Sequence, residues 1–287
     1  MSVPASPGGP FVDLHAHSTA SDGALPAAAV VAAAFAAGLA AVALTDHDTM
    51  AGVPEAVAAG EQLGIRVVAG VELSAYDDVA EIHLLGLHIN DPSGIESALE
   101  GFRRDRRDRA VEIVKRLQTL GVPLGMDAVL AQADGGAIGR PHVARALIAA
   151  GYARDSRDAF DRYLGAGRPA NVPKARLEIS EAIALVHAAG GVAVYAHPGA
   201  DGTVARIGRL TEIGLDGVEV RHPGHGAEDT ARLGALAGHF GLVPSGGSDW
   251  HGAAHGPRVL GAMKVPFEWL ERQVARAMLH RAPAAAI

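Results

Sequence analysis

Short apolar runs recur along the chain, and most of them end in histidine or in a carboxylate residue. The first run covers residues 11–17, in which His15 and His17 stand two positions apart. Side chains alternate along an extended strand, so these two imidazoles point to the same side and form a pincer suited to a metal ion. A single His-x-His motif is equally compatible with two polar residues at a strand end. The later strand ends therefore decide the interpretation.

Six further strands are predicted, at residues 39–44, 66–72, 81–87, 191–196, 215–220 and 242–247. Most are almost entirely apolar, which is typical of parallel strands that are covered on both faces. Helices are predicted between them, for example at 26–38, where Pro26 and Gly38 act as start and stop signals. Repeated strand–helix units predict a parallel sheet closed into a barrel, with all strand carboxyl ends on one face.

The alternation is interrupted between residues 95 and 172, where helical periodicity and Gly/Pro stops replace buried strands. Helices are predicted there at 95–120, 127–133, 142–150 and 157–164. We therefore predict an α/β fold with a seven-stranded barrel domain formed by 11–94 and 173–287. An inserted helical subdomain at 95–172 is expected to cap the substrate.

Cysteine is absent from the chain, which has 287 residues and a formal net charge of −7. This composition excludes disulfides and thiolate metal sites, and a reducing, cytoplasmic setting is the simplest. The negative charge argues against a general electrostatic attraction to nucleic acid, but it allows a local basic pocket for a small anion. The N-terminal segment lacks the charged and apolar regions of a signal peptide. The most apolar stretch, 25–44, is interpreted as a helix and a strand rather than a membrane span.

The predicted strand ends supply nine potential metal ligands. Nine is too many for one ion and suits two or three divalent ions that share a bridging carboxylate. Any one of these residues could instead be a hydrogen-bonded polar group, but their joint position at strand ends favours a metal centre. The nine are His15, His17, Asp22, His47, Glu72, His83, His197, Asp249 and His251.

The same residues belong to an ordered set of motifs that resembles the polymerase-and-histidinol-phosphatase (PHP) family of phosphoesterases. The motifs fall within residues 11–90 and 178–265. They are His15-x-His17, Thr45-Asp46-His47-Asp48, Gly70-Val71-Glu72, Ile82-His83, Ala196-His197-Pro198 and Ser248-Asp249-x-His251. The resemblance implies a distorted (β/α)7 barrel with a trinuclear metal centre.

The resemblance also assigns the ligands to ions. It places His15, His17, Glu72 and Asp249 on one ion, and Glu72 bridges to a second ion held with His83 and His197. The third ion is held by Asp22, His47 and His251. Many relatives have histidine at the position of Asp22, and the extra carboxylate makes this site harder and more tolerant of manganese or magnesium. Mn²⁺, Zn²⁺, Fe²⁺ and Mg²⁺ all remain open.

A centre of this kind makes a hydroxide that bridges two ions available near neutral pH, because metal ions depress the pKa of bound water. We expect this hydroxide to attack phosphorus in line. The chain has no P-loop or G-x-S-x-G pattern that would indicate another nucleophile. The leaving alkoxide needs a proton, for which His222 and His225 are candidates just after the sixth strand. We favour His225, and either residue could instead be a histidine of the rim.

The inserted helices are expected to overhang the metal face and to select the substrate. Arg140 and His142 open a helix in a Gly-Arg-Pro-His element, where backbone N–H groups also favour an anion. A helix start with a solvated arginine is the alternative interpretation. The element is similar to that of the PHP branch that acts on nucleoside 3′,5′-bisphosphates and short oligonucleotides. That resemblance implies that Arg140 and Lys174 hold a second, distal phosphate.

We therefore expect a metal-dependent phosphomonoesterase that converts a nucleoside 3′,5′-bisphosphate to the 5′-monophosphate. The nearest alternative is a 5′-3′ exonuclease on short RNA or DNA, although the few aromatic residues and the negative charge weigh against it. Histidinol-phosphate phosphatase, carbon–nitrogen hydrolysis as in the amidohydrolases, and a non-catalytic PHP scaffold are more distant alternatives. We expect no membrane partner and no stable complex with nucleic acid.

Overall fold

The computed structural model describes residues 11–133, 138–173 and 176–281. They form two compact units, the first of which runs to Glu96 and resumes at Leu177, and the second of which is Ser97–Arg176. Helix α3 (Ser93–Thr119) begins in the first unit and belongs mostly to the second. Within the described ranges, no helix has the length and apolar character needed to cross a membrane.

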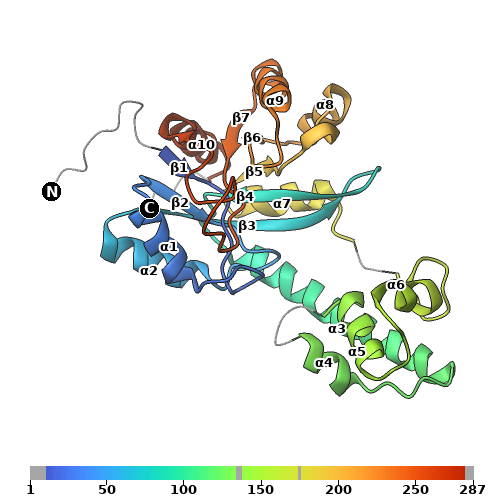
Figure 1. The fold of residues 1–287 in the computed structure, drawn as a ribbon. Coiled ribbons are helices and arrows are strands. Elements are labelled where there is room, and N and C mark those ends of the chain that lie inside the picture. The colour runs from blue at the N-terminus through green and yellow to red at the C-terminus, as the bar shows by residue number, and fades with distance from the viewer. Residues whose placement is uncertain (1–10, 134–137, 174–175, 282–287) are drawn as a thin grey trace, which may run out of the picture. The chain divides into compact units, whose positions relative to one another are not determined.

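An eight-stranded sheet lies at the centre of the first unit. Its strand order is β7-β6-β5-β4-β3-β2-β1-β8 (Figure 1). The strands are β1 Phe11–Asp13, β2 Ala41–Leu44, β3 Arg66–Tyr76, β4 Glu81–Leu87, β5 Val192–Tyr195, β6 Gly217–Arg221, β7 Val243–Gly246 and β8 Val265–Pro266. The first seven lie where the sequence predicts them, and the α/β barrel fold is confirmed. β8 is missing from the prediction because a strand of two residues produces no detectable periodicity.

The sheet is nearly closed, because the residues after β1 pair with those after β7. The amide of Leu14 donates to the carbonyl of Gly246 at 3.1 Å, and the amide of His17 donates to the carbonyl of Trp250 at 2.9 Å. Ala16 and Trp250 form a parallel bridge at the same place. The motifs near residues 15 and 250 thereby become neighbours.

The sheet also differs from the prediction in strand direction, since its strands are not all parallel. β4 pairs antiparallel with both β3 and β5, whereas β1–β2, β2–β3, β5–β6 and β6–β7 are parallel. The connection at 77–80 is too short for the crossover that a parallel pair needs. The reversal places the beginning of β4, which carries His83, beside the carboxyl end of β5. There the amide of Ala196 donates to the carbonyl of His83 at 3.0 Å.

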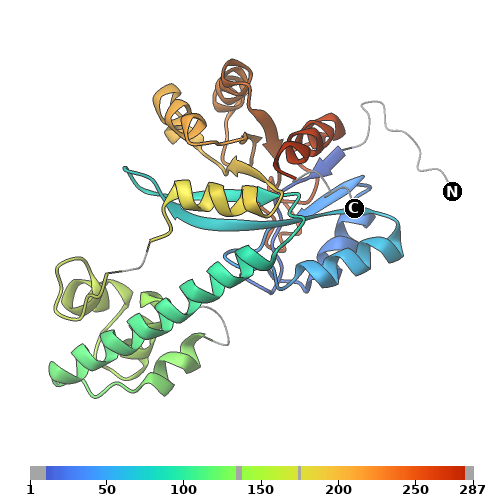
Figure 2. The same ribbon diagram turned by 180° about the vertical axis from the view of Figure 1, so that it is seen from behind.

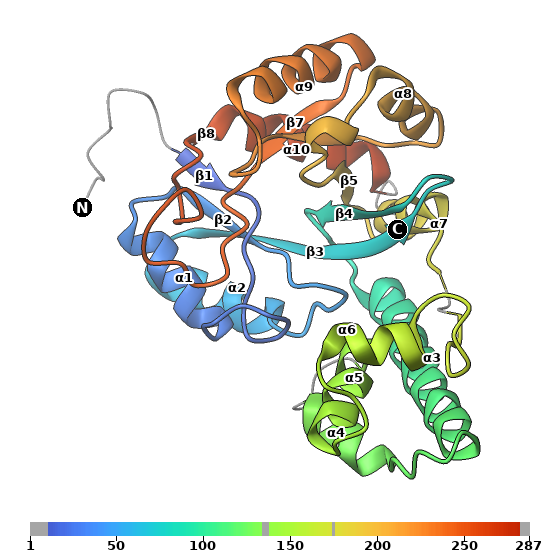
Figure 3. The ribbon, with the colours of Figure 1, turned by 45° about the vertical axis from the view of Figure 1, so that its right-hand side comes forward.

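Helices flank the strands of the first unit. Helices α1 and α2 lie on one side of the strands and α8 and α9 on the other (Figure 3), while α7 lies along the β3–β4 hairpin (Figure 2). Their bounds are α1 Ala27–Ala36, α2 Val53–Leu63, α7 Ile179–Ala188, α8 Val204–Glu212, α9 Ala227–Phe240 and α10 Phe267–His280, with a short 3-10 helix, η2, at Gly199–Asp201. Such helices shield a parallel sheet from solvent on its outer face.

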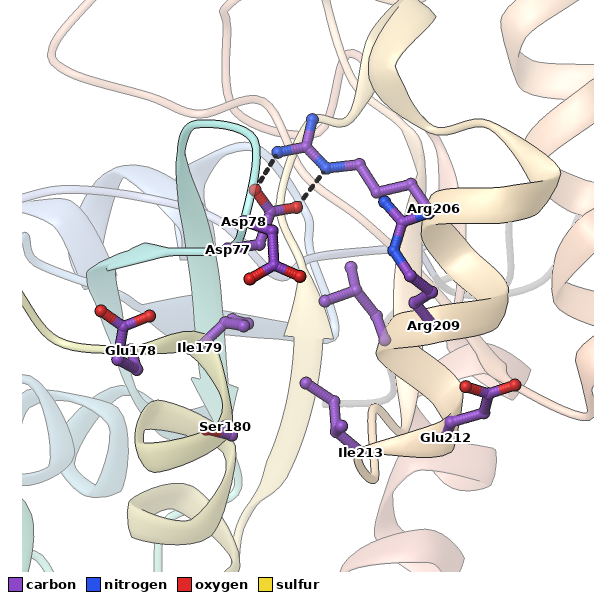
Figure 4. Close-up of a pocket in the computed structure, with 10 residues that line it drawn as sticks. Asp77, Asp78, Glu178, Ile179, Ser180, Arg206, Arg209, Glu212 and Ile213 are labelled. Carbon is purple, nitrogen blue, oxygen red and sulfur yellow. Dashed lines mark hydrogen bonds and ion pairs between the residues drawn. The ribbon is translucent and has the colours of Figure 1, made fainter.

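The tip of the β3–β4 hairpin is held by an ion pair with α8. Asp77 accepts hydrogen bonds from Nε and Nη2 of Arg206 at 2.6 and 2.9 Å, and both side chains are buried (Figure 4). The same carboxylate accepts from the backbone amides of Val79 and Ala80. Because this bidentate pair has further hydrogen bonds that offset the loss of hydration, it can fix the hairpin that carries Glu72 and His83.

The second unit is helical, as the sequence predicts for this part of the chain. After α3 come α4 (Met126–Ala133), α5 (Arg140–Ala149), α6 (Ser156–Ala159) and one π-helical turn, η1 (Phe160–Leu164). The unit has a hydrophobic core of its own, which includes Leu117, Val129, Leu147 and Leu164. A separate core of this kind allows the unit to pack independently of the barrel.

Candidate metal centre

A cavity of about 320 Å³ lies at the end of the sheet where the carboxyl ends of the parallel strands meet. Six of the nine predicted ligands line it, namely His47, Glu72, His83, His197, Asp249 and His251. His15 and His17 are fully buried beneath it, in contact with Glu72 and Asp249. Asp22 joins the group through His251, with 3.2 Å between its Oδ1 and Nε2 of the ring. The structure thus brings all nine residues together.

Glu72 lies at the middle of this group, buried on β3. Its Oε1 is 2.7 Å from Nδ1 of His83 and 3.0 Å from Nε2 of His197. Its Oε2 is 3.1 and 3.2 Å from Nε2 of His15 and His17. The two oxygens therefore face different sets of imidazoles, which is the arrangement required of a carboxylate that bridges two ions.

The potential ligand atoms fall into three overlapping groups at this end of the sheet. Within each group the atoms lie within 4.8 Å of one another. One group is the set that the resemblance assigns to the first ion. The three groups are His15, His17, Glu72 and Asp249; then His17, Asp22, His47 and His251; and then His47, Glu72 and His83.

These residues fit divalent metal ions. Both ring nitrogens of His17 are buried and form no hydrogen bond, although Nε2 lies 3.2 Å from Glu72 and 3.3 Å from Asp249. Buried polar atoms that lack a hydrogen bond are rare in proteins, and a metal ion bound between His17 and the two carboxylates would satisfy Nε2. The donors are imidazoles and carboxylates, which suit zinc, iron, manganese and magnesium.

The carboxylates of the centre stay ionised in spite of their surroundings. Burial alone would raise the pKa of Glu72, but His15 and the other imidazoles around it hold the pKa well below its usual value. The pKa of Asp249 is likewise lowered, against the effect of burial, by neighbouring imidazoles and Arg258. At Asp22 the hydrogen bond with His251 lowers the pKa to about 2. Ionised carboxylates are the form that binds cations.

Two of the predicted ligands have a left-handed backbone, which is uncommon for residues other than glycine. The φ angle is 50° at Asp249 and 29° at His197. Such conformations cost on the order of 1–3 kcal/mol and cluster at functional sites. Here the backbone amide of His197 donates to Oε2 of Glu219 at 2.7 Å, a bond that helps to hold the turn.

Glu219 is a residue of the centre that the sequence interpretation missed. It is fully buried on β6, and its Oε1 lies 3.2 Å from Nδ1 of His15. A carboxylate on one ring nitrogen fixes the tautomer and leaves the other nitrogen free to bind metal. The available signal was a carboxylate between two valines in the sixth predicted strand.

Two other carboxylates hold the loops that carry predicted ligands. Asp13 accepts hydrogen bonds from the amides of Ser248 and Gly261, both at 2.9 Å. Asp46 accepts from the amide and the hydroxyl of Ser18, both at 2.7 Å. The first set of bonds fixes the loop after β7, and the second fixes the loop after β1.

The two predicted acids differ in their hydrogen bonds. In His225, Nδ1 donates to the carbonyl of Val220 at 3.1 Å and Nε2 accepts from the amide of Gly199 at 3.1 Å. In His222, Nδ1 accepts from the amide of Gly224 at 3.0 Å, so Nε2 carries the proton, 3.3 Å from Asp249. Proton donation stays a prediction for both; the backbone engages both ring nitrogens of His225, whereas in His222 the hydrogen on Nε2 faces Asp249.

The predicted phosphate-binding residues belong to the second unit. Arg140 and His142 lie in the first turn of α5, where Nη1 of Arg140 donates to the carbonyl of Leu164 at 3.2 Å. Nδ1 of His142 accepts from the amide of Gly139 at 2.9 Å. Lys174 lies outside the described residues. The role of all three towards a substrate stays a prediction.

Comparison with known proteins identifies the family. Residues 13–122 match the family model of the PHP domain. The chain is 38% identical over 245 residues to a 5′-3′ exoribonuclease of Haemophilus influenzae, an alignment that covers 83% of this chain and 89% of that protein. The chain belongs to the PHP family.

Two further comparisons support the chemistry of this PHP-family chain. It is 36% identical over 258 residues to a 3′,5′-nucleoside bisphosphate phosphatase of Chromobacterium violaceum, with 87% of this chain and 90% of that protein covered. A solved structure from Bifidobacterium adolescentis, described as a metal-dependent phosphoesterase, is 35% identical with a TM-score of 0.72, covering 94% of this chain and 98% of the other. The family, the relatives and the ligand cluster together identify a metal-dependent hydrolase of phosphate esters, as the sequence predicts.

Proposed function

We propose that the chain removes the 3′-phosphate from a nucleoside 3′,5′-bisphosphate, giving the nucleoside 5′-monophosphate and phosphate. The observation that carries the chemistry is the position of Glu72, whose two carboxylate oxygens face two different sets of imidazoles. The similarity to the bisphosphate phosphatase of Chromobacterium violaceum over 87% of the chain supports the choice of substrate. The cytoplasm is the proposed location, in line with the absence of cysteine.

The proposed centre holds three ions in the sets that the resemblance gives. When bound, divalent ions activate water as a nucleophile at neutral pH and stabilise negative charge on phosphoryl oxygens. In the chain itself, Glu219 orients His15, and Asp13 and Asp46 orient the ligand loops. His222 lines the cavity with the hydrogen on Nε2, from where it can donate a hydrogen bond to an oxygen of the substrate.

The inserted helices are proposed to bind the second phosphate. Arg140, Lys174 and the free Nε2 of His142 are the donors we assign to it, because Nδ1 of His142 already accepts from the backbone. A second charged group recognised apart from the reacting one would distinguish a bisphosphate from a simple monophosphate.

A 5′-3′ exonuclease activity on short oligonucleotides is the second candidate, and one observation favours it. The exoribonuclease of Haemophilus influenzae is 38% identical to the chain. The same ligand set could serve a diester as well as a monoester, since the reacting atom is phosphorus in both.

Phosphate release separates these candidates. The Mn²⁺-loaded protein is assayed with nucleoside 3′,5′-bisphosphates, nucleoside 5′-monophosphates, histidinol phosphate and short oligonucleotides, with metal content measured in parallel. We expect the bisphosphates to have the highest kcat/KM. A metal-loaded protein that releases no phosphate from any of them would refute the phosphatase proposal, and a preference for oligonucleotides would favour the second candidate.

Arg140→Ala tests the phosphate-binding role. We expect kcat/KM to fall about 100-fold on a bisphosphate and less than about threefold on an aryl phosphate, because the aryl ester has no distal phosphate. Arg145→Ala is the matched control on the same helix, where the exposed Arg145 donates to the carbonyl of Gln132. Equal losses on both substrates would remove Arg140 from substrate recognition.

A further inference from the structure

Arg258 adds a permanent positive charge to the cavity of the metal centre. It lies in the irregular segment between β7 and β8, and among the described residues that line the cavity it alone is an arginine or a lysine. Its side chain is 47% exposed. The sequence interpretation gave it no role, because it follows no motif and no periodic element.

We propose that Arg258 binds the reacting phosphate group inside the metal cavity. Nη1 of Arg258 contacts Oδ2 and the backbone carbonyl oxygen of Asp249. Within the described chain, Nη1 makes every hydrogen bond of this side chain, so Nη2 and Nε remain available. Guanidinium groups present paired N–H donors that match two oxygens of a phosphate.

The contact with Asp249 is compatible with a loaded metal centre. Oδ1 of Asp249 lies 3.5 Å from Nε2 of His15 and 3.3 Å from Nε2 of His17. Oδ2 points the other way, towards His222 at 3.3 Å and towards Arg258. One oxygen can therefore bind metal while the other holds the guanidinium, and Asp249 serves as the positioning residue for Arg258.

The backbone around Arg258 is anchored on both sides. The indole nitrogen of Trp250 donates to the carbonyl of Ala253 at 2.8 Å. On the other side, Leu260 is buried and the amide of Gly261 donates to Asp13 at 2.9 Å. An arginine between two fixed points loses less freedom on binding a ligand than one on an unrestrained loop.

The negative charge of the site explains why a bound phosphate group needs such a donor. Glu72 and Asp249 are buried carboxylates that line the cavity, and Glu219 is a buried carboxylate behind His15. A phosphate dianion that enters this cavity is repelled by them unless cations compensate. Arg258 provides a fixed part of that compensation, at the reacting phosphate and separately from the distal phosphate assigned to Arg140. This inference rests on the phosphoester chemistry of the proposed function, but it is independent of which nucleotide is the substrate.

Calorimetric titration with inorganic phosphate tests the inference without turnover. The Mn²⁺-loaded protein is compared with Arg258→Ala, with Arg258→Lys, and with the control Arg272→Ala, an exposed arginine that lines a different pocket beside Gly241. We expect the Kd for phosphate to rise about 10- to 100-fold in Arg258→Ala, as for the loss of hydrogen bonds from a charged donor. Arg258→Lys should be intermediate because it keeps the charge and loses the paired donors. Metal content should stay unchanged in all variants.

Two results would overturn the inference. One is a phosphate Kd in Arg258→Ala within twofold of the unmodified protein. The other is a loss of bound Mn²⁺ that accounts for the loss of phosphate affinity, since Arg258 would then act on the metal site through Asp249. If no phosphate ester is hydrolysed while phosphate binding still depends on Arg258, the proposed function fails and the inference stands.

Discussion

Nδ1 of His15 lies 3.2 Å from Oε1 of Glu219, while Nε2 of the same ring faces Glu72 at 3.1 Å. All three side chains are buried. A carboxylate of the sixth strand thus orients the ring of His15, and the imidazole lies between two carboxylates, as expected of the predicted metal ligand. Histidine ligands of metal ions are commonly oriented in this way by a hydrogen bond on the opposite nitrogen.

Glu219→Gln should weaken metal binding about 10- to 100-fold, because the neutral amide no longer fixes the tautomer or supports the basicity of His15. Competition with a chelator measures the affinity. The control is Glu228→Gln, which changes an exposed glutamate in the first turn of α9. A metal affinity equal to that of the control would show that Glu219 is only a structural residue.

Removal of the metal ions should abolish hydrolysis and lower the Tm. The buried carboxylates and imidazoles lose the cations that stabilise them, and a bound ion contributes about 2.7 kcal/mol to stability at a concentration of 100 times its Kd. Dialysis against EDTA followed by addition of Mn²⁺ checks both effects by phosphate release and thermal unfolding. Full activity in a protein shown by elemental analysis to be metal-free would contradict the prediction.

Asp77→Asn should destabilise the first unit by about 3 kcal/mol. The change removes the negative charge opposite Arg206, which is only 6% exposed, and leaves the buried guanidinium with only its longer contact to Asp201, at 3.8 Å (Figure 4). Asp78→Asn, at the exposed neighbouring position, should change stability by less than about 0.5 kcal/mol. Urea unfolding of the two variants gives the comparison. Equal effects would mean that the ion pair does not stabilise the hairpin.

His88 should make stability depend on pH. Burial lowers its pKa to about 4, so the folded protein keeps the ring neutral while the unfolded chain binds a proton near pH 6.5. Its contribution is therefore fully present above pH 6.5 and is lost as the pH falls towards 4, by about 3 kcal/mol in all. His88→Asn suits the positive φ of 60° and cannot titrate. Urea midpoints at pH 7.5, 6 and 5 should fall more steeply for the unmodified protein, and parallel decreases would exclude His88 as the cause.

Most strands and all nine predicted ligands could be placed from local patterns, because each ligand follows or interrupts an apolar run. β4 was predicted at 81–87 and is found at Glu81–Leu87. Its direction does not follow from the apolar pattern of the strand, but the short gap at 73–80 between the predicted strands 66–72 and 81–87 was an available signal, because a parallel crossover needs about a dozen residues or more. The reversal explains why His83 faces Glu72 from the beginning of a strand rather than from its end.

The site residues that the sequence interpretation missed cannot be recognised from a local sequence pattern. Glu219 is 204 positions from His15, and only the closed barrel brings them together. Arg258 lies in a segment with no periodicity, and its place is set by the distant carboxylate of Asp13 through Gly261. For His225, the sequence shows a histidine near the site but cannot show that the backbone occupies both ring nitrogens.

The hydrogen bond from Ser248 to Asp13 joins residues 235 positions apart. Ribosomes add about 5–20 residues per second, so about 10 to 50 s pass between the synthesis of these two residues. Throughout that interval the emerging chain carries His15 and His17 without Asp249, their predicted partner on the same ion. The complete set of predicted ligands therefore exists only after Asp249 and His251 have been synthesised, and ions that the emerging polypeptide meets before that point find an incomplete site.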